Sequence, residues 1–270
     1  MTSRRALWLF VLALALTPSF ATAAPVDLNT WTAESYPAVA GFGAGVWTVN
    51  LDGSAVFQSV NGQPTVFYSD FNAYNTDVTG RIRVSTGAGD DDYIGFVLGF
   101  DPSDTTNAGA DYLLVDWKQI DQAFDFGNPS TTPGTTAQRG LAVSRVTGIP
   151  FADEFWGHVD QAGNPAGGLA ELQRGATLSD TGWAHGTEYE FRFIFTPTNL
   201  QVFVNGVQQI DVDGAFADGR LGFYNFSQQS VTYSAFTVDP APNPTPEPGI
   251  LMLLGVGLAF VTRNASRRKA

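Results

Sequence analysis

Three consecutive aspartates, Asp90, Asp91 and Asp92, form the densest acidic run in the sequence. Adjacent carboxylates repel one another, so a loop that keeps three together usually holds a cation or loses stability. Hard oxygen donors of this kind favour calcium over zinc or copper. Alternation at the entry of a strand would place Asp90 and Asp92 on one side and Asp91 on the other. The residues predict a calcium site, and a solvated acidic turn before a strand is the alternative.

Two more aspartates and two histidines are the next residue types to consider as metal ligands. Asp70 and Asp77 precede the strand predicted over 80–84 and are candidates for further calcium ligands. His158 and His185 lie far apart and lack the i, i+4 spacing of a metal-binding pair, which predicts loop residues. The chain has no cysteine, which excludes disulfides, thiol chemistry and cysteine-based zinc sites.

Pairs of acidic residues are the groups with which a protein would cut a glycan, because glycoside hydrolysis needs two carboxylates about 5–10 Å apart. Glu188 and Glu190 share one face of a predicted strand, opposite a phenylalanine stripe, and are expected to face solvent. Asp153 and Glu154 have no identifiable third acid nearby, and the chain has no G-x-S-x-G motif. We therefore predict a protein that is not an enzyme, with a secreted glycoside hydrolase or lyase as the alternative.

Two tryptophans are candidates for contact with a polysaccharide. Trp156 and Trp183 would serve as exposed aromatic platforms for sugar rings. Large aromatic side chains are more often buried, so a place in the core is the alternative for each.

The elements that must position these side chains are predicted to be strands. Short runs rich in Val, Ile, Phe and Tyr recur between residues 24 and 240, separated by Gly, Asn, Asp and Pro. The apolar run 93–100 is expected to form a hairpin with 112–117, and residues 189–195 alternate strictly. Asn205-Gly206 is a strong signal for a type I′ hairpin turn. About a dozen such strands predict one all-β domain, a β-sandwich or jelly roll of two antiparallel sheets.

Both ends of the chain are typical of sorting signals. Arg4 and Arg5, the apolar run after them and the small residues 21–23 predict a secretory signal peptide. A proline-rich stretch near the other end predicts an extended spacer. The apolar residues after it are too few for a permanent span of about 20 residues, and the basic end would stay cytoplasmic during export. The predicted organisation is signal peptide 1–23, β-sandwich 24–239, linker 240–248 and sorting tail 249–270, with transient membrane association through 249–262.

The charge of the processed chain limits its partners. Removal of both signals leaves 8 Lys and Arg against 25 Asp and Glu, a net charge of −17. Nucleic acid is excluded because its recognition needs basic patches. The acidity suits a calcium-rich exterior, and acidity that only keeps a secreted protein soluble is the alternative.

The motif at the C-terminal end resembles a known sorting signal. Pro246-Glu247-Pro248, an apolar stretch and an arginine-rich end together resemble the PEP-CTERM signal of Gram-negative bacteria. The resemblance implies recognition by an exosortase, cleavage near residues 246–248, and release to the outer surface or an exopolysaccharide matrix. A single-pass inner-membrane tail is the alternative.

Four segments in order resemble the C-terminal domain of thrombospondins. They are Trp47 to Asn50 with Phe57 to Asn61, Asp90 to Phe100, Asp116 to Gln119, and Gly219 to Gln229. The resemblance implies a concanavalin-type, lectin-like jelly roll that binds calcium and serves adhesion or matrix contact. We therefore expect an exported calcium-binding module at the cell surface or in the extracellular matrix. Its expected partner there is extracellular polysaccharide or another matrix component.

Overall fold

The computed structural model of the chain describes residues 24–37, 41–127, 134–161 and 164–240. The predicted signal peptide, the sorting motif Pro246-Glu247-Pro248 and the apolar tail lie outside these residues. Within the described ranges, no helix is long and apolar enough to cross a membrane.

Strands make up most of the described chain, which also holds two short helices. The strands are β1 (Ala24–Pro25), β2 (Thr32–Ser35), β3 (Trp47–Val49), β4 (Ala55–Gln58), β5 (Thr65–Asn72), β6 (Thr76–Val84), β7 (Tyr93–Phe100), β8 (Asp111–Lys118), β9 (Gln122–Phe124), β10 (Thr135–Ala137), β11 (Gly140–Gly148), β12 (Gly167–Arg174), β13 (Glu188–Thr196), β14 (Asn199–Val204), β15 (Val207–Asp213), β16 (Arg220–Phe226) and β17 (Val231–Pro240). The helices are a 3-10 turn (Leu28–Thr30) and α1 (Ala152–Gly157).

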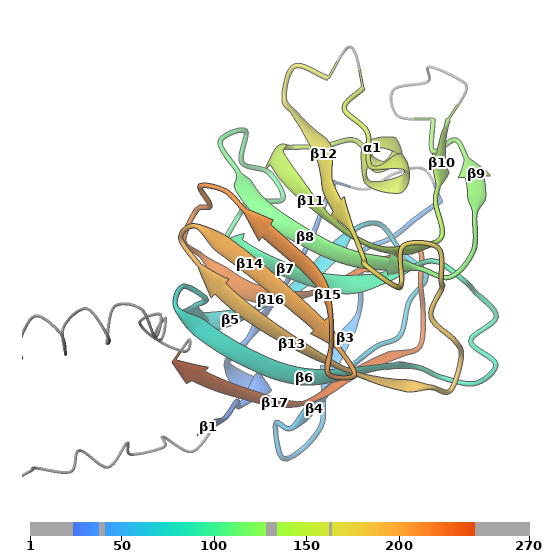
Figure 1. Cartoon of the computed structure of the whole chain (residues 1–270). Coiled ribbons are helices and arrows are strands. Elements are labelled where there is room, and N and C mark those ends of the chain that lie inside the picture. Colours follow the sequence, from blue (N-terminus) through green and yellow to red (C-terminus); the bar gives the residue numbers. More distant parts are fainter. Residues whose placement is uncertain (1–23, 38–40, 128–133, 162–163, 241–270) are drawn as a thin grey trace, which may run out of the picture.

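Two large sheets pack face to face as a sandwich (Figure 1). The eight-stranded sheet has the order β15-β14-β13-β6-β17-β4-β3, with β1 paired to β17. The seven-stranded sheet has the order β12-β11-β8-β7-β16-β5-β2, and β9 and β10 form a separate ribbon. Neighbouring strands run antiparallel, and the predicted all-β jelly-roll sandwich is confirmed.

Alternating side chains build the core between the sheets. On β13, Phe191, Phe193 and Phe195 are buried while Glu188 and Glu190 are exposed, as the alternation predicts. From the facing sheet, the ring of Phe96 lies 5.0 Å from that of Phe191 and 4.7 Å from that of Phe193. Aromatic pairs in this range gain energy beyond the area that they bury.

Both hairpins predicted from the sequence form. β7 and β8 form the expected hairpin, with Ile94 opposite Trp117 and Leu98 opposite Leu113. Between β14 and β15, Asn205 and Gly206 have φ values of 49° and 77°, which a type I′ turn requires at both central positions.

A second apolar core covers the outer face of the seven-stranded sheet. It includes Tyr93 and Val97 of β7, and Phe126, Phe155 and Trp156 lie over them. In Figure 1, α1 and the β9–β10 ribbon lie on the side of this sheet that faces away from the eight-stranded sheet. All eight residues of β7 are consequently buried. Polar residues on this outer face are therefore shielded from water and need partners within the protein.

Candidate functional site

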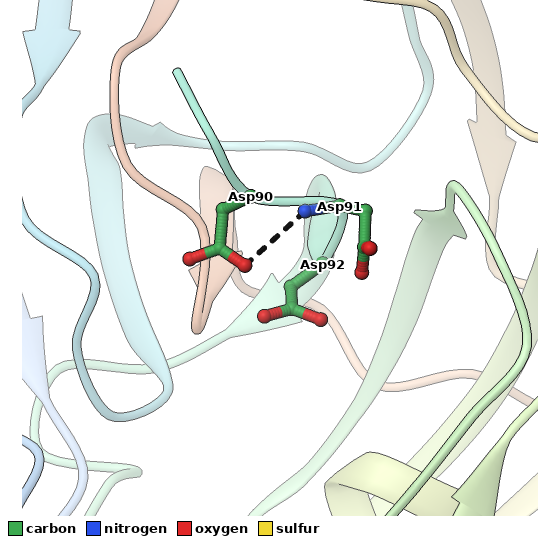
Figure 2. Close-up of side chains that lie close together, drawn as sticks. All are labelled: Asp90, Asp91 and Asp92. Atoms are coloured by element: carbon green, nitrogen blue, oxygen red, sulfur yellow. Dashed lines mark hydrogen bonds between the residues drawn. The ribbon is translucent and has the colours of Figure 1, made fainter. Parts of the chain in front are cut away.

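The loop of residues 85–92 joins β6 to β7 and ends in the three aspartates. One carboxylate oxygen from each of Asp90, Asp91 and Asp92 lies within 4.8 Å of the others. Figure 2 shows the three side chains gathered beside the same stretch of loop. The predicted separation, with Asp91 on the opposite side, is wrong because β7 begins only at Tyr93, so the alternation of a strand does not apply to this loop.

Two other loops contact the acidic loop. The amide of Asn61 donates to Asp90 Oδ2, and Ser227 Oγ lies 3.3 Å from Asn61 Oδ1. The backbone N–H of Asp92 donates to Gln228 Oε1 at 2.8 Å. Within the acidic loop, Asp91 N donates to Asp90 Oδ1 at 3.2 Å (Figure 2). The fold thus brings together three of the segments on which the sequence resemblance rests.

A buried lysine neutralises part of this acidic charge. The fully buried Lys118 of β8 donates from Nζ to Asp91 Oδ1 at 2.9 Å and to Asp92 Oδ1 at 2.6 Å. The same ammonium contacts the Asp91 carbonyl at 2.9 Å and Gln122 Oε1 at 3.0 Å, and lies 4.9 Å from the centre of the Trp156 ring. Sequence reasoning missed this role. Lys118 lies in one of the segments of the resemblance, but no short-range pattern links it to a loop 26 residues away.

Burial raises the pKa of Asp92 to about 7, with Asp90 adding repulsion and Lys118 acting in the opposite direction. The carboxyl group of Asp92 is therefore costly to ionise although a lysine is present. A further cation would favour its ionised form.

The two tryptophans predicted as exposed sugar platforms are buried, so that prediction is wrong. Trp156 is 1% and Trp183 2% exposed. Each indole N–H has a backbone partner: Trp156 donates to the Gln122 carbonyl and Trp183 to the Asp92 carbonyl, both at 3.0 Å. Large aromatic rings stay buried where their one polar atom is satisfied. Trp156 instead lies beside the ammonium of Lys118, and Trp183 bonds the acidic loop itself.

Asp70 and Asp77 do not join the acidic loop. Asp77 forms a bidentate ion pair with Arg192, at 2.8 and 2.5 Å. It lies near the start of β6, roughly 23 Å along the strand from Val84, where the acidic loop begins, at about 3.3 Å per residue. Asp70 is exposed on β5, at the end of the seven-stranded sheet opposite the start of β7. Neither residue is therefore in place to supply a ligand to Asp90–Asp92.

A second cluster of charges lies under α1 on the outer face of the seven-stranded sheet. His158 follows α1 in the left-handed conformation, with φ 51°. Its Nε2 lies 3.0 Å from Asp116 Oδ2 and its Nδ1 lies 3.1 Å from Glu171 Oε2. Arg174 NH1 donates to the same Glu171 oxygen at 2.8 Å. The fold thus brings β8, β12 and the end of α1 together around one imidazole.

Electrostatics within this second cluster keep the imidazole charged. Burial alone would lower the pKa of His158, but Asp116 and Glu171 outweigh it and raise the pKa to about 9. Burial raises the pKa of Asp116, and His158 opposes that shift. His158 lies in the turn after α1, as predicted for a loop residue, but its side chain is only 7% exposed, which the sequence did not indicate. No sequence spacing indicates the cluster, since His158 and Asp116 are 42 residues apart.

The acids considered for glycan hydrolysis have structural partners. Glu154 accepts from the backbone N–H groups of Phe151 at 2.6 Å and Gln161 at 2.9 Å. Asp153 Oδ1 accepts from the N–H of Phe126 at 3.1 Å. These bonds tie α1 to the neighbouring loops, and both acidic side chains are buried.

The second acid pair faces solvent. Glu188 and Glu190 lie 3.5 and 3.6 Å from the guanidinium of Arg81, and all three side chains are about half exposed. Ion pairs of this kind contribute little to stability, and this is the solvent-facing arrangement that the alternation on β13 predicts.

The two antiparallel sheets and their strand order define a lectin-like jelly-roll protein. Within that class, the chain belongs to the thrombospondin C-terminal region family, whose model matches residues 43–241. A second family model, the PEP-CTERM protein-sorting motif, matches residues 244–269. Both resemblances predicted from the sequence are confirmed.

Curated relatives are full-length thrombospondins, of which this chain covers a small part. Thrombospondin-2 of Gallus gallus is 30% identical over 200 residues, which is 70% of this chain and 16% of that protein. Thrombospondin-3 of Mus musculus is 29% identical over 200 residues, again 70% of this chain and 19% of that protein.

Among solved structures, the carbohydrate binding module CBM66 from Bacillus subtilis is similar over 78% of this chain and 95% of its own. Its TM-score is 0.48 and its sequence identity 9%. The jelly-roll architecture is assigned from the strand pairing within this chain and not from that similarity.

The acidic loop has the donor set that calcium prefers. Asp90 makes no contact with Lys118, and Asp91 and Asp92 each bond it through one oxygen only, so the second carboxylate oxygen of each is free of the lysine. Calcium takes oxygen ligands alone, usually six to eight. Asp90, Asp91 and Asp92 offer oxygen donors of this kind and are the residues that would hold such an ion.

Proposed function

We propose that this chain is an exported, non-catalytic binding module of the cell surface or extracellular matrix, and that its acidic loop binds calcium. The observation that carries the proposal is the convergence of three carboxylates within 4.8 Å at the junction of three loops. Membership of the thrombospondin C-terminal region family supports the same function.

Calcium at this position would supply the positive charge that Lys118 provides only in part. Lys118 faces Asp91 and Asp92, whereas the hydrogen-bond donors that Asp90 meets within the described residues, Asn61 and the Asp91 N–H, are neutral. A bound ion would also tie the acidic loop to its two neighbours, because all three meet at these side chains. Since the ammonium repels a second cation nearby, we expect calcium to bind more weakly than it would without the lysine.

Calorimetric unfolding of residues 24–240 with calcium, and then with excess chelator, tests the proposal. A ligand that binds only the native state at about 100 times its dissociation constant adds about 2.7 kcal/mol. For a domain of this size that raises Tm by roughly 5–10 °C. We expect Asp91→Asn and Asp90→Asn to remove the shift and the exposed Asp70→Asn to leave it intact. A Tm that calcium does not change in the parent protein would refute the metal site.

Export and surface display rest on the two ends of the chain. The PEP-CTERM match supports processing by an exosortase near Pro246-Glu247-Pro248, and the basic and apolar start supports a cleaved signal peptide. Expression of the parent and of Glu247→Ala in a host with an exosortase, followed by fractionation, tests this. We expect the variant to stay with the inner membrane and the parent to reach the surface; equal distribution of the two would contradict the proposal.

The expected ligand at that location is an extracellular polysaccharide or another matrix component. The acidic net charge of the processed chain makes nucleic acid an unfavourable partner. The alternative, a secreted glycan hydrolase or lyase, is disfavoured by the structural bonds of Asp153 and Glu154 and by the exposed pairing of Glu188 and Glu190 with Arg81. Release of reducing ends from a host polysaccharide would favour that alternative.

A further inference from the structure

A polar cavity of about 200 Å³ lies where α1 ends against β12, apart from the acidic loop. It is lined by Gln138, Gly157, His158, Val159, Glu171 and Arg174. Pockets for drug-sized ligands measure about 300–1,000 Å³, so this cavity has room for one small ring.

The charged residues around the cavity are held in fixed positions. His158 is held through Nε2 by the fully buried Asp116 and through Nδ1 by Glu171. Its ring also stacks on Tyr93, with centroids 5.4 Å apart and planes at 30°. Arg174 is fixed by bonds from Nε to the Ser179 carbonyl at 3.0 Å and from NH2 to the Arg139 carbonyl at 2.6 Å. A wall built this way loses little conformational entropy when it binds a ligand.

Glu171 and Arg174 present an acceptor and a donor side by side at the cavity. Within the described part of the chain, the hydrogen bonds that Glu171 accepts all go to Oε2, from His158 and Arg174. Its Oε1 is therefore available, and the side chain is 29% exposed. A guanidinium carries five N–H donors, and Arg174 uses three of its own in the bonds given above. A hydroxyl group is both donor and acceptor, and adjacent hydroxyls match such a pair.

The charge balance indicates a neutral ligand. The carboxylates of Asp116 and Glu171 are matched by the charged His158 and by Arg174. Because these charges already cancel, an anionic or cationic ligand would bring a charge without a partner into the site. Val159 is 39% exposed at the cavity and offers an apolar surface to the C–H face of a ring. The combination of neutral hydroxyls with one apolar face is that of a neutral sugar.

We infer that this cavity binds one neutral sugar residue, with Glu171 accepting and Arg174 donating hydrogen bonds to adjacent hydroxyls. The inference rests on the polysaccharide part of the proposed function and names where that ligand binds. It is independent of the calcium site, because no residue that lines the cavity belongs to the acidic loop.

Saturation-transfer NMR on the full-length protein tests the inference, with the methyl glycosides of glucose, galactose, mannose and N-acetylglucosamine as probes and methyl glucuronide as the anionic comparison. We expect at least one neutral glycoside to bind and the glucuronide not to bind. Glu171→Gln should weaken binding at least tenfold, while Glu190→Gln, an exposed glutamate on the other sheet, should leave it unchanged. No neutral binding, preferred binding of the glucuronide, or equal binding by Glu171→Gln would overturn the inference.

A second variant covers the case in which Glu171→Gln unfolds. Val159→Phe places a larger ring at the partly exposed rim of the cavity and leaves the charges intact, so we expect a folded protein that no longer binds the glycoside. Unchanged binding in this variant would also overturn the inference. If the protein binds a neutral glycoside but calcium does not raise its Tm, the inference is supported and only the calcium proposal is refuted.

Discussion

Replacement of Lys118 by methionine tests how the acidic loop is stabilised. The substitution keeps an unbranched side chain in the buried space but removes the ammonium that contacts Asp91 and Asp92 at 2.9 and 2.6 Å. Removal of one partner of a buried ion pair leaves an uncompensated charge and costs about 3–5 kcal/mol. In a domain of this size that lowers Tm by roughly 6–20 °C.

Differential scanning calorimetry in chelator measures this loss, with Arg139→Met as the matched control. Arg139 pairs with Asp180 at 2.7 Å, but the two side chains are 40% and 77% exposed, so we expect the Tm of the Arg139→Met protein to stay close to that of the parent. A Lys118→Met protein as stable as the parent in chelator would refute the conclusion that the lysine compensates the buried carboxylates.

Calcium gives the same variant a second readout. Without the ammonium, an ion meets less repulsion at Asp91 and Asp92 and gains the oxygens that the lysine had bonded, so we expect calcium to raise Tm more in Lys118→Met than in the parent. An equal or smaller calcium shift in the variant would show that lysine and calcium do not share these carboxylates.

Three further predictions concern the surrounding structure. His158 has a pKa of about 9 in the folded protein, above its ordinary value of 6.5, so the stability that the charged imidazole contributes is complete below pH 6.5 and is lost as pH rises through 9. Tm measured from pH 6 to 10 should fall accordingly. A His158→Gln protein whose Tm has the same dependence on pH would contradict this prediction. Trp183→Phe leaves the buried Asp92 carbonyl without its donor and should cost about 1–3 kcal/mol in urea unfolding, whereas an unchanged midpoint would mean that the bond contributes nothing. Gly95→Ala puts a Cβ 2.2 Å from a carbonyl oxygen of β8 and should lower the free energy of unfolding by about 1–3 kcal/mol. The control Gly43→Ala meets no atom within 4 Å and should leave stability unchanged. Equal stabilities of the two variants would contradict the tight packing of β7 against β8.

The acidic loop and the His158 cluster are each anchored by a residue of the same strand, β8. Asp116 anchors His158 and Lys118 anchors Asp91 and Asp92, and these two anchors are two residues apart on β8. Residues i and i+2 of a strand point to the same face. Both anchors are therefore covered by the second core, which explains why each is fully buried and each has a partner of opposite charge.

Several strands, the buried face of β13 and one hairpin turn followed from local patterns in the sequence. The alternation in 189–195 predicted which face of β13 is buried, and Asn205-Gly206 predicted the turn that fixes the β14–β15 register. These signals are local because side chains alternate with a period of two and a two-residue turn has few allowed conformations. The run Asp90–Asp92 was also recognisable, because carboxylates adjacent in the sequence stay close together in any fold and together attract a cation.

The partners of those residues could not be predicted from the sequence alone. Lys118 and His158 meet acids between 13 and 42 residues away, and Asp77 meets Arg192 instead of the acidic loop. Such pairs depend on which strands become neighbours and on the register between them. Whether Trp156 is exposed depends on α1 folding back over the outer face of the seven-stranded sheet.

The sequence by itself thus determined the β-sandwich, its family and the acidic loop. Only the tertiary structure decided which charges lie together and which aromatic rings are exposed. The physical reason is that propensity and alternation act over a few residues, whereas burial and charge pairing arise from contacts between segments far apart in the chain.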